Sequence, residues 1–143
     1  MKKTLLFAIL SILLSACAQP EKQAENAEDD PNMAGVEKTI GLYIEGSRQG
    51  KSEITAQAFA EGATLSGIYN GEFMLVPIQV LYDLVDKNGA QEVTYKIESC
   101  SVDSDVAIVR LDAQFGSRKY TDMFTMVKDG SNWKIISKVY HLH

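Results

Sequence analysis

The chain has 143 residues, of which 45% are hydrophobic and 23% are charged, and its formal net charge is −5. This length suits one domain with a sizeable core and a short extension. The acidic balance and the lack of a cluster rich in lysine and arginine argue against nucleic acid as a partner, because nucleic-acid binding needs a basic face.

The N-terminus has the layout of a secretory signal peptide. Two lysines after the first methionine are followed by an apolar run of 11 residues, 4–14, and then by the small residues Ser15 and Ala16. A membrane-spanning helix needs about 20 apolar residues, so this run is too short for one. The pattern therefore predicts a signal peptide over residues 1–16.

The segment Leu14-Ser15-Ala16-Cys17 resembles the lipobox of bacterial lipoproteins. The resemblance implies that the Cys17 thiol receives a diacylglycerol and that cleavage makes Cys17 the first residue, with an acylated amino group. More than one acyl chain makes membrane attachment stable. We therefore expect a lipid-anchored protein of the cell envelope. In a Gram-negative cell, a residue other than Asp at position 18 implies transfer to the outer membrane, facing the periplasm.

Residues 17–30 are predicted to be the lipidated cysteine and a flexible acidic tether. The stretch 18–30 has five acidic residues against one lysine and no apolar periodicity, so it cannot bury enough apolar surface to fold. Loss of the two signal-peptide lysines lowers the net charge of the mature chain from −5 to −7. The tether is expected to hold a folded domain, residues 31–143, away from the lipid surface.

Cys100 is the only thiol left after lipidation of Cys17, so the domain can form no internal disulfide. We expect Cys100 to be buried and inert, with a reactive thiol or an intermolecular disulfide as the alternative. No set of Cys and His residues has the spacing of a metal site, and no glycine-rich phosphate loop is present. The sequence therefore predicts neither a metal nor a cofactor.

Two helices are predicted at the start of the domain. Asp30-Pro31 is typical of an N-cap followed by a proline in the first turn, and Gly50 ends this helix. Its apolar residues recur at helical spacing: Val36, Ile40, Tyr43 and Ile44. Ser52 can cap a short second helix, which includes Phe59 and is broken by Glu61-Gly62.

A hairpin and a third helix are predicted next. Asn70-Gly71 favours a type I′ turn, which would join strands 64–69 and 72–76. Pro77 is expected to open the third helix, and Asn88-Gly89 to end it.

The remainder of the domain predicts four strands in an antiparallel meander, 92–102, 105–115, 118–128 and 132–142. In the last strand, simple alternation places five residues on one face: Trp133, Ile135, Ser137, Val139 and His141. The reverse face is only half polar and holds Lys134, Ile136, Lys138, Tyr140 and Leu142. Such a face indicates either contact with a second subunit or a partly covered sheet.

Asp122 lies on a predicted inner face together with Tyr120, Phe124 and Met126. A carboxylate on an apolar face must be partnered or protonated, because a bare buried charge is too costly. A two-residue loop before the last strand would place Tyr120 opposite His141 and Asp122 opposite Val139, so that Asp122 is diagonal to His141. Asp122 and His141 are therefore candidates for an acid–base pair. The alternative is a structural Asp that accepts from a Tyr hydroxyl or a backbone N–H.

The order helix, helix, hairpin, helix, four-stranded meander resembles the nuclear transport factor 2-like superfamily. Three segments are similar to its bacterial "putative lumazine-binding" group: Tyr43-Ile44-Glu45-Gly46, Tyr120-Thr121-Asp122-Met123-Phe124 and residues 133–141. The resemblance covers residues 35–143 and implies an α+β, cystatin-like cone. Three helices would pack on a curved antiparallel sheet and enclose a pocket at its wide end. Members include isomerases, dehydratases and non-catalytic proteins, and many dimerise through the sheet, so we expect a homodimer.

Because this superfamily includes both enzymes and non-catalytic proteins, the fold says little about function. Our leading hypothesis is a membrane-tethered, non-catalytic domain that binds a small apolar or aromatic ligand. The expected pocket residues are Tyr43, Tyr69, Phe73, Tyr82, Tyr120, Asp122, Trp133 and His141. One alternative is an enzyme of lyase or isomerase type that uses Asp122 and His141. In that case Tyr43 and Asp122 resemble the oxyanion donors of ketosteroid isomerases, although a matching carboxylate base is missing. The other alternative is a purely structural or interaction protein.

Overall fold

The structure, a computed structural model, describes residues 30–143. The predicted signal peptide, the lipidation site Cys17 and nearly all of the tether lie outside the described residues. No helix within residues 30–143 is long and apolar enough to cross a membrane. The elements in chain order are α1 (Pro31–Gln49), α2 (Ser52–Thr55), η1 (Ala56–Ala58), β1 (Phe59–Tyr69), β2 (Glu72–Pro77), α3 (Gln79–Asn88), β3 (Val93–Asp103), β4 (Val106–Phe115), β5 (Arg118–Asp129) and β6 (Asn132–Leu142).

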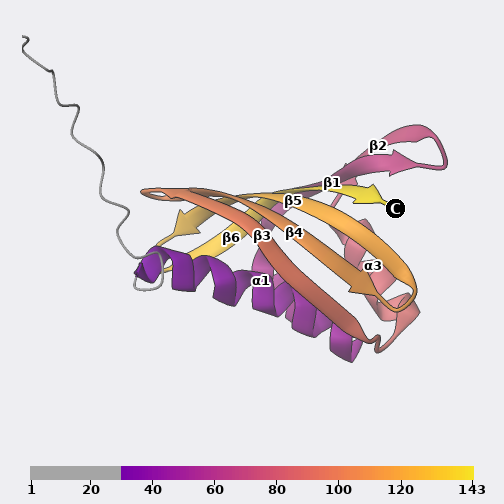
Figure 1. The fold of residues 1–143 in the computed structure, drawn as a ribbon. Coiled ribbons are helices and arrows are strands. Elements are labelled where there is room, and N and C mark those ends of the chain that lie inside the picture. The colour runs from indigo at the N-terminus through magenta and orange to yellow at the C-terminus, as the bar shows by residue number, and fades with distance from the viewer. Residues whose placement is uncertain (1–29) are drawn as a thin grey trace, which may run out of the picture.

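All six strands form one curved sheet, in the order β2-β1-β6-β5-β4-β3. The helix α1 runs along one face of this sheet, and α3 lies at the end where the β1–β2 hairpin projects and the chain terminates, here called the wide end (Figure 1). The predicted α+β architecture is confirmed. The sheet is mixed rather than wholly antiparallel, because β1 pairs with β6 in parallel.

The predicted start and end of α1 are confirmed. The Asp30 side chain accepts a hydrogen bond of 2.8 Å from the Asn32 backbone N–H. Gly50 ends the helix in the left-handed conformation, with φ 64°, which glycine adopts without steric cost. The apolar residues of α1 that face the sheet are buried, among them Val36, Ile40 and Ile44.

The second helix is shorter than predicted, and the third begins later. Phe59 is extended and pairs with Ile135 of β6, so strand pairing overrides the helical pattern before Glu61-Gly62 is reached. Pro77 is the last residue of β2, and α3 begins at Gln79. The Asn70-Gly71 turn is confirmed, with positive φ at both residues, 51° and 83°.

A β-bulge in β6 changes which side chains face the core. Thr125 of β5 pairs with Ser137, but the next residue, Met126, pairs with Ile135. Ile136 is therefore an extra residue on β6, and one extra residue reverses the alternation of every side chain beyond it.

The predicted inner face of β6 is consequently wrong after Ile135. Trp133 and Ile135 are buried as predicted, but Lys138 replaces Val139 on the inner face and is buried. His141, predicted to face inward, is exposed. The half-polar reverse face inferred from the sequence is therefore not one surface. Its residues before the bulge point away from the core, and its residues after the bulge point toward it.

Candidate functional site

Asp122 on β5 is a fully buried carboxylate in an apolar core, with an exposed fraction of 0%. Its neighbours on the inner face of β5 are Phe124 and Met126, both buried. The prediction that this carboxylate needs partners is confirmed, since it accepts hydrogen bonds from two side chains on two other elements.

Tyr43 of α1 and Lys138 of β6 are the partners of Asp122. The Tyr43 hydroxyl donates to Asp122 Oδ2 over 3.0 Å. The Lys138 ammonium donates to Asp122 Oδ1 and forms a salt bridge with it. Tyr43 is 2% and Lys138 is 4% exposed, so the Tyr43–Asp122–Lys138 cluster is closed to water in this conformation.

Aromatic rings enclose the charged end of Lys138. Its Nζ lies 5.4 Å from the ring centroid of Tyr43, 5.5 Å from that of Phe124 and 5.6 Å from that of Tyr140. Each distance lies within the range of a cation–π contact. Lys138 is thus held by one carboxylate and three ring faces.

Burial changes the protonation equilibria of this cluster. Desolvation lowers the pKa of Lys138, and the negative charge of Asp122 opposes that change only in part. Desolvation also raises the pKa of Tyr43 well above its ordinary value, with further increases from the charge and the hydrogen bond of Asp122. The Tyr43 hydroxyl therefore remains a donor, while the Lys138 amine loses its proton more readily than a solvated lysine.

A chain of aromatic rings leads from the cluster to the wide end of the sheet. Tyr43 contacts Phe115, Phe115 contacts Tyr120, and Tyr120 contacts Tyr140, with centroid separations of 5.8, 5.8 and 6.1 Å. Phe115, Tyr120 and Tyr140 are only half-buried. Asp122 pairs with Tyr140, and Tyr120 pairs with Leu142, the last residue of β6. Only one inward-facing pair of residues, Tyr120 and Leu142, thus lies between Asp122 and the end of that strand.

The predicted register of β5 and β6 is wrong by one residue. Asp122 lies opposite Tyr140 rather than Val139, and Tyr120 lies opposite Leu142 rather than His141. The bulge at Ile136 produces this shift. Asp122 is buried and His141 is exposed on the other face of the sheet, so the structure does not bring the two predicted acid–base candidates together.

The other predicted pocket residues are dispersed. Tyr82 of α3 is half-buried and packs against Phe59, at 6.1 Å between ring centroids. Trp133 is buried at the opposite end of the sheet, where its ring packs on Gly35 near the start of α1. Tyr69 and Phe73 are on the projecting hairpin and are 57% and 73% exposed. Of the predicted set, only Tyr43, Tyr82, Tyr120 and Asp122 belong to the cluster or to the aromatic contacts around it.

Sequence reasoning assigned Lys138 to the outer face and so missed it as a member of the site. The available signal was the break in alternation along β6, where Lys138 stands between apolar Val139 and the run Ile135-Ile136. Only a bulge can place both Ile135 and Lys138 on one face of a strand, because odd and even positions otherwise alternate.

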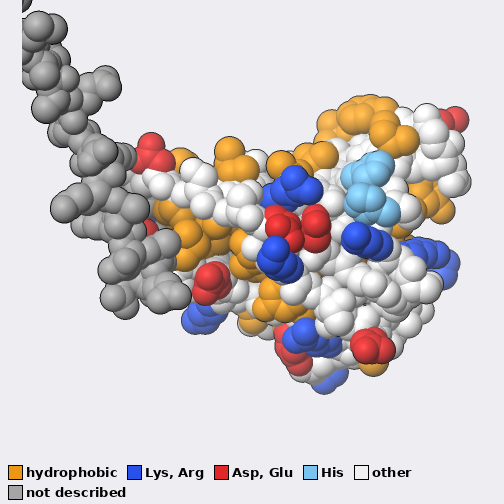
Figure 2. Space-filling view, viewed as in Figure 1, with side chains coloured by type: hydrophobic (Ala, Val, Ile, Leu, Met, Phe, Trp, Pro, Cys, Tyr) orange, Lys and Arg blue, Asp and Glu red, His pale blue; other side chains and the backbone are white. Residues whose placement is uncertain are grey.

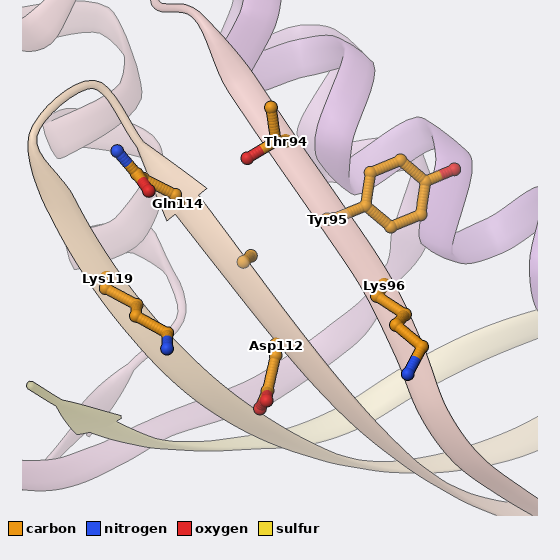
Figure 3. Close-up of a pocket in the computed structure, with 7 residues that line it drawn as sticks. Thr94, Tyr95, Lys96, Asp112, Gln114 and Lys119 are labelled. Atoms are coloured by element: carbon orange, nitrogen blue, oxygen red, sulfur yellow. The ribbon is translucent and has the colours of Figure 1, made fainter.

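Two shallow depressions, of about 260 and 250 Å³, lie away from this cluster. The larger is formed by β3, β4 and the start of β5, where Lys96, Asp112 and Lys119 project on the side of the sheet away from α1 (Figure 3). Beside it, Thr121 Oγ1 donates to Asp112 over 2.8 Å and lies 3.0 Å from His143 Nε2. Within residues 30–143, no group of three or more Cys, His, Asp and Glu side chains is arranged to hold a metal ion.

Solved structures of proteins with similar sequences have the same fold as this domain. A nuclear transport factor 2-like protein of unknown function from Shewanella baltica superposes with a TM-score of 0.74 at 28% identity, covering 78% of this chain and 94% of its own. A second such protein, from Methylobacillus flagellatus, gives a TM-score of 0.74 at 29% identity, covering 78% and 92%. The nuclear transport factor 2-like fold inferred from the sequence is thus confirmed.

Two further similarities bear on family and chemistry. The aldolase FrzH of a Cladobotryum species is 26% identical over 106 residues, which cover 72% of this chain and 85% of that protein. Residues 31–141 match the family described as "Putative lumazine-binding". The match spans almost all of the folded domain, including every member of the Tyr43–Asp122–Lys138 cluster. This chain therefore belongs to the "Putative lumazine-binding" family.

Proposed function

We propose that this domain binds a small molecule that enters at the wide end of the sheet and reaches the Tyr43–Asp122–Lys138 cluster. One observation carries the proposal: a carboxylate, an amine and a phenol converge in an apolar interior, one inward-facing position from the strand end. Apolar walls with a few convergent polar groups are typical of small-molecule sites. The description of the family supports a pteridine-like ligand.

The cluster suits a flat ligand with both donor and acceptor atoms on one edge. Asp122 can accept a hydrogen bond, while Tyr43 and Lys138 can donate. The half-buried rings of Tyr120 and Tyr140 can pack against a planar molecule in edge-to-face or offset geometry. Entry requires these rings to move, because the cluster is closed in the present conformation.

Titration of the full chain with lumazine, followed by the fluorescence of this pteridine, tests the proposal. We expect saturable binding, weakened about tenfold or more in the double variant Asp122→Leu/Lys138→Met, since hydrogen bonds to charged groups contribute about 1.5–3 kcal/mol. Tyr95→Ala is the matched control, because Tyr95 is 42% exposed on the edge strand β3. Equal binding by the double variant, or no binding of lumazine or of other flat heteroaromatic molecules to the parent chain, contradicts the proposal.

A lyase acting on a carbonyl substrate is the second candidate function. The similarity to an aldolase favours it, as does the buried amine of Lys138, whose pKa is lowered by desolvation. The acid and base of this lyase would be Lys138 and Asp122, rather than the pair Asp122 and His141 that the sequence predicted. Exchange of α-hydrogens of cyclohexanone with heavy water, followed by NMR, is the corresponding assay. A rate unchanged by Asp122→Leu/Lys138→Met would refute this candidate.

We also propose that the domain is held at the cell envelope through a lipidated Cys17. The lipobox-like segment 14–17 and the acidic stretch behind it support this assignment. Palmitate supplied to expressing cells should label the full chain, and Cys17→Ser should abolish both the label and cleavage before residue 17. Cys100→Ser is the matched control and should keep the label. Labelling of the Cys17→Ser chain would refute the anchor.

The outer face of the sheet supports a further proposal, the homodimer expected from the resemblance. Hydrophobic side chains lie along the upper rim of the molecule and over the β1–β2 hairpin (Figure 2). Those exposed on the sheet and the hairpin include Ile68, Phe73, Leu75, Met123 and Val139. Apolar groups gathered on one surface are typical of an interface. Sedimentation equilibrium of the full chain measures its mass directly, and a monomer at every concentration tested would exclude the dimer.

A further inference from the structure

We propose that Lys138 is a nucleophilic amine that forms an imine with an aldehyde or ketone, so that the ligand class of this site is a carbonyl compound. The inference rests on the proposed function, because it requires that a small molecule reach the cluster. It adds a covalent step and a chemical class that a binding site for a flat molecule does not require.

The surroundings of Lys138 favour a reactive amine. Lys138 is the one lysine among the buried residues of the part of the chain that the structure describes. Three aromatic rings surround its Nζ, and on the strand beside it Leu65 of β1 lies opposite. Removal from water disfavours the ammonium form more than Asp122 favours it, so the pKa of Lys138 is lowered overall. Desolvation of lysine in a hydrophobic pocket is one of the ways in which proteins activate it as a nucleophile.

The two other members of the cluster supply the groups that imine formation needs. Asp122 contacts Lys138 directly and can accept the ammonium proton. The Tyr43 hydroxyl remains protonated and donates to the other oxygen of the same carboxylate, at 3.0 Å. A proton acceptor, a nucleophile and a fixed donor therefore lie within one connected hydrogen-bonded group.

Tyr140 lies beside this group: its ring centroid is 5.6 Å from Lys138 Nζ, and it is opposite Asp122 in the sheet. Its ring lies on Gly67 of the neighbouring strand, so closely that a Cβ at Gly67 would be 2.8 Å from Tyr140 Cε1. On the other side it meets Tyr120 edge to face. Both tyrosines are only half-buried, so their side chains can change rotamer without separating strands. The inference requires that such a rotation uncover Lys138.

The step balances without an external oxidant or reductant. Lys138 transfers its ammonium proton to Asp122, and the free amine attacks the carbonyl carbon to form a C–N bond. The attacking nitrogen passes one proton to the carbonyl oxygen, which becomes a hydroxyl group. Asp122 returns the proton it accepted to this hydroxyl group, and the C–O bond breaks as the oxygen leaves as water. The nitrogen then carries a C=N bond to the ligand, and hydrolysis reverses every step.

Reductive trapping tests the inference. The full chain is treated near pH 7 with benzaldehyde and sodium cyanoborohydride, which reduces the C=N bond, and the modified lysine is located by peptide mass spectrometry. We expect an adduct equal to the mass of the aldehyde less one oxygen, formed on Lys138 about tenfold or more faster than on Lys134. Each unit by which a lysine pKa falls gives about tenfold more free amine at this pH.

Lys134 is the matched control within the same chain. It is on the same strand before the bulge, is half-buried, and donates to the Gln57 carbonyl over 2.6 Å, away from the cluster. Asp122→Asn should change the rate of trapping at Lys138, because the carboxylate both favours the ammonium form and accepts its proton, and should leave trapping at Lys134 unchanged. Trapping at Lys138 that is no faster than at Lys134 overturns the inference, whatever the folding of any variant.

Benzyl alcohol separates this inference from the proposed function, because it has the same ring but no carbonyl group. If NMR shows that both compounds bind at the cluster and no adduct forms on Lys138, the imine is refuted and the binding site stands. If neither compound nor lumazine binds, the proposed function fails, and the imine fails with it.

Discussion

The substitution Asp122→Ala is expected to lower the free energy of unfolding by about 3–5 kcal/mol, because it leaves the Lys138 charge buried without a partner. The same change also removes the acceptor of the Tyr43 hydroxyl, which is itself fully enclosed. Urea denaturation followed by circular dichroism measures the difference.

The outer face of the sheet provides the control for this prediction. Asp112 is an aspartate on the adjacent strand β4 with its own basic partner, Arg110, at 3.9 Å, and its side chain is 30% exposed. Exposed ion pairs contribute about 0–1 kcal/mol. Asp112 also accepts a hydrogen bond of 2.8 Å from the Thr121 hydroxyl, and such a bond contributes about 1 kcal/mol, so Asp112→Ala should lower the free energy of unfolding by no more than about 2 kcal/mol. If Asp122→Ala and Asp112→Ala lower the free energy of unfolding by the same amount, the buried cluster does not behave as a desolvated ion pair.

The double variant Asp122→Leu/Lys138→Met separates the stability of the cluster from its function. Replacement of both charges by apolar groups of similar volume is often neutral or stabilising, whereas removal of one charge is strongly destabilising. The double variant should therefore recover most of the stability lost in Asp122→Ala. A chain that is stable without these two charges and does not bind lumazine would show that Asp122 and Lys138 serve a ligand rather than the fold.

Most of the fold followed from local signals in the sequence. The capping by Asp30, the left-handed Gly50 and the Asn70-Gly71 turn are fixed by chemistry within a few residues of each site. Such signals do not depend on distant partners, and the predicted elements around them are confirmed. The limits of α2 and α3 were wrong because Phe59 and Pro77 belong to strands whose partners lie elsewhere in the chain.

The site was only half predictable. Asp122 was recognisable because a carboxylate in an apolar alternation must find a partner, and Tyr43 was named among the pocket residues. Lys138 was not recognised, since one extra residue at Ile136 reverses the face of β6, and the break in alternation along this strand does not by itself show which residue is extra. The same shift sent His141 outward and removed it from the site.

The substitution Gly46→Ala is expected to lower the free energy of unfolding by about 2–3 kcal/mol, the upper range for overpacking of a well-filled interior. A Cβ at Gly46 would lie 2.1 Å from Thr55 Oγ1 and 2.5 Å from the Thr55 backbone nitrogen. The second atom is main chain, so rotation of a side chain cannot relieve the overlap. Helices α1 and α2 would have to separate where α1 holds Tyr43, one turn before Gly46, against the sheet.

Gly41→Ala is the matched control, and its expected effect has the opposite sign. Gly41 is on the same helix α1, and a Cβ there would meet no atom within 4 Å. Alanine in a helix interior is favoured over glycine by about 0.5–1 kcal/mol, so this variant should be more stable than the parent chain. Thermal and urea unfolding of the two variants side by side measure both signs. Equal shifts in the two variants would mean that helix propensity, rather than the contact of Gly46 with Thr55, sets the outcome, and that α1 is not held against α2 as the structure shows.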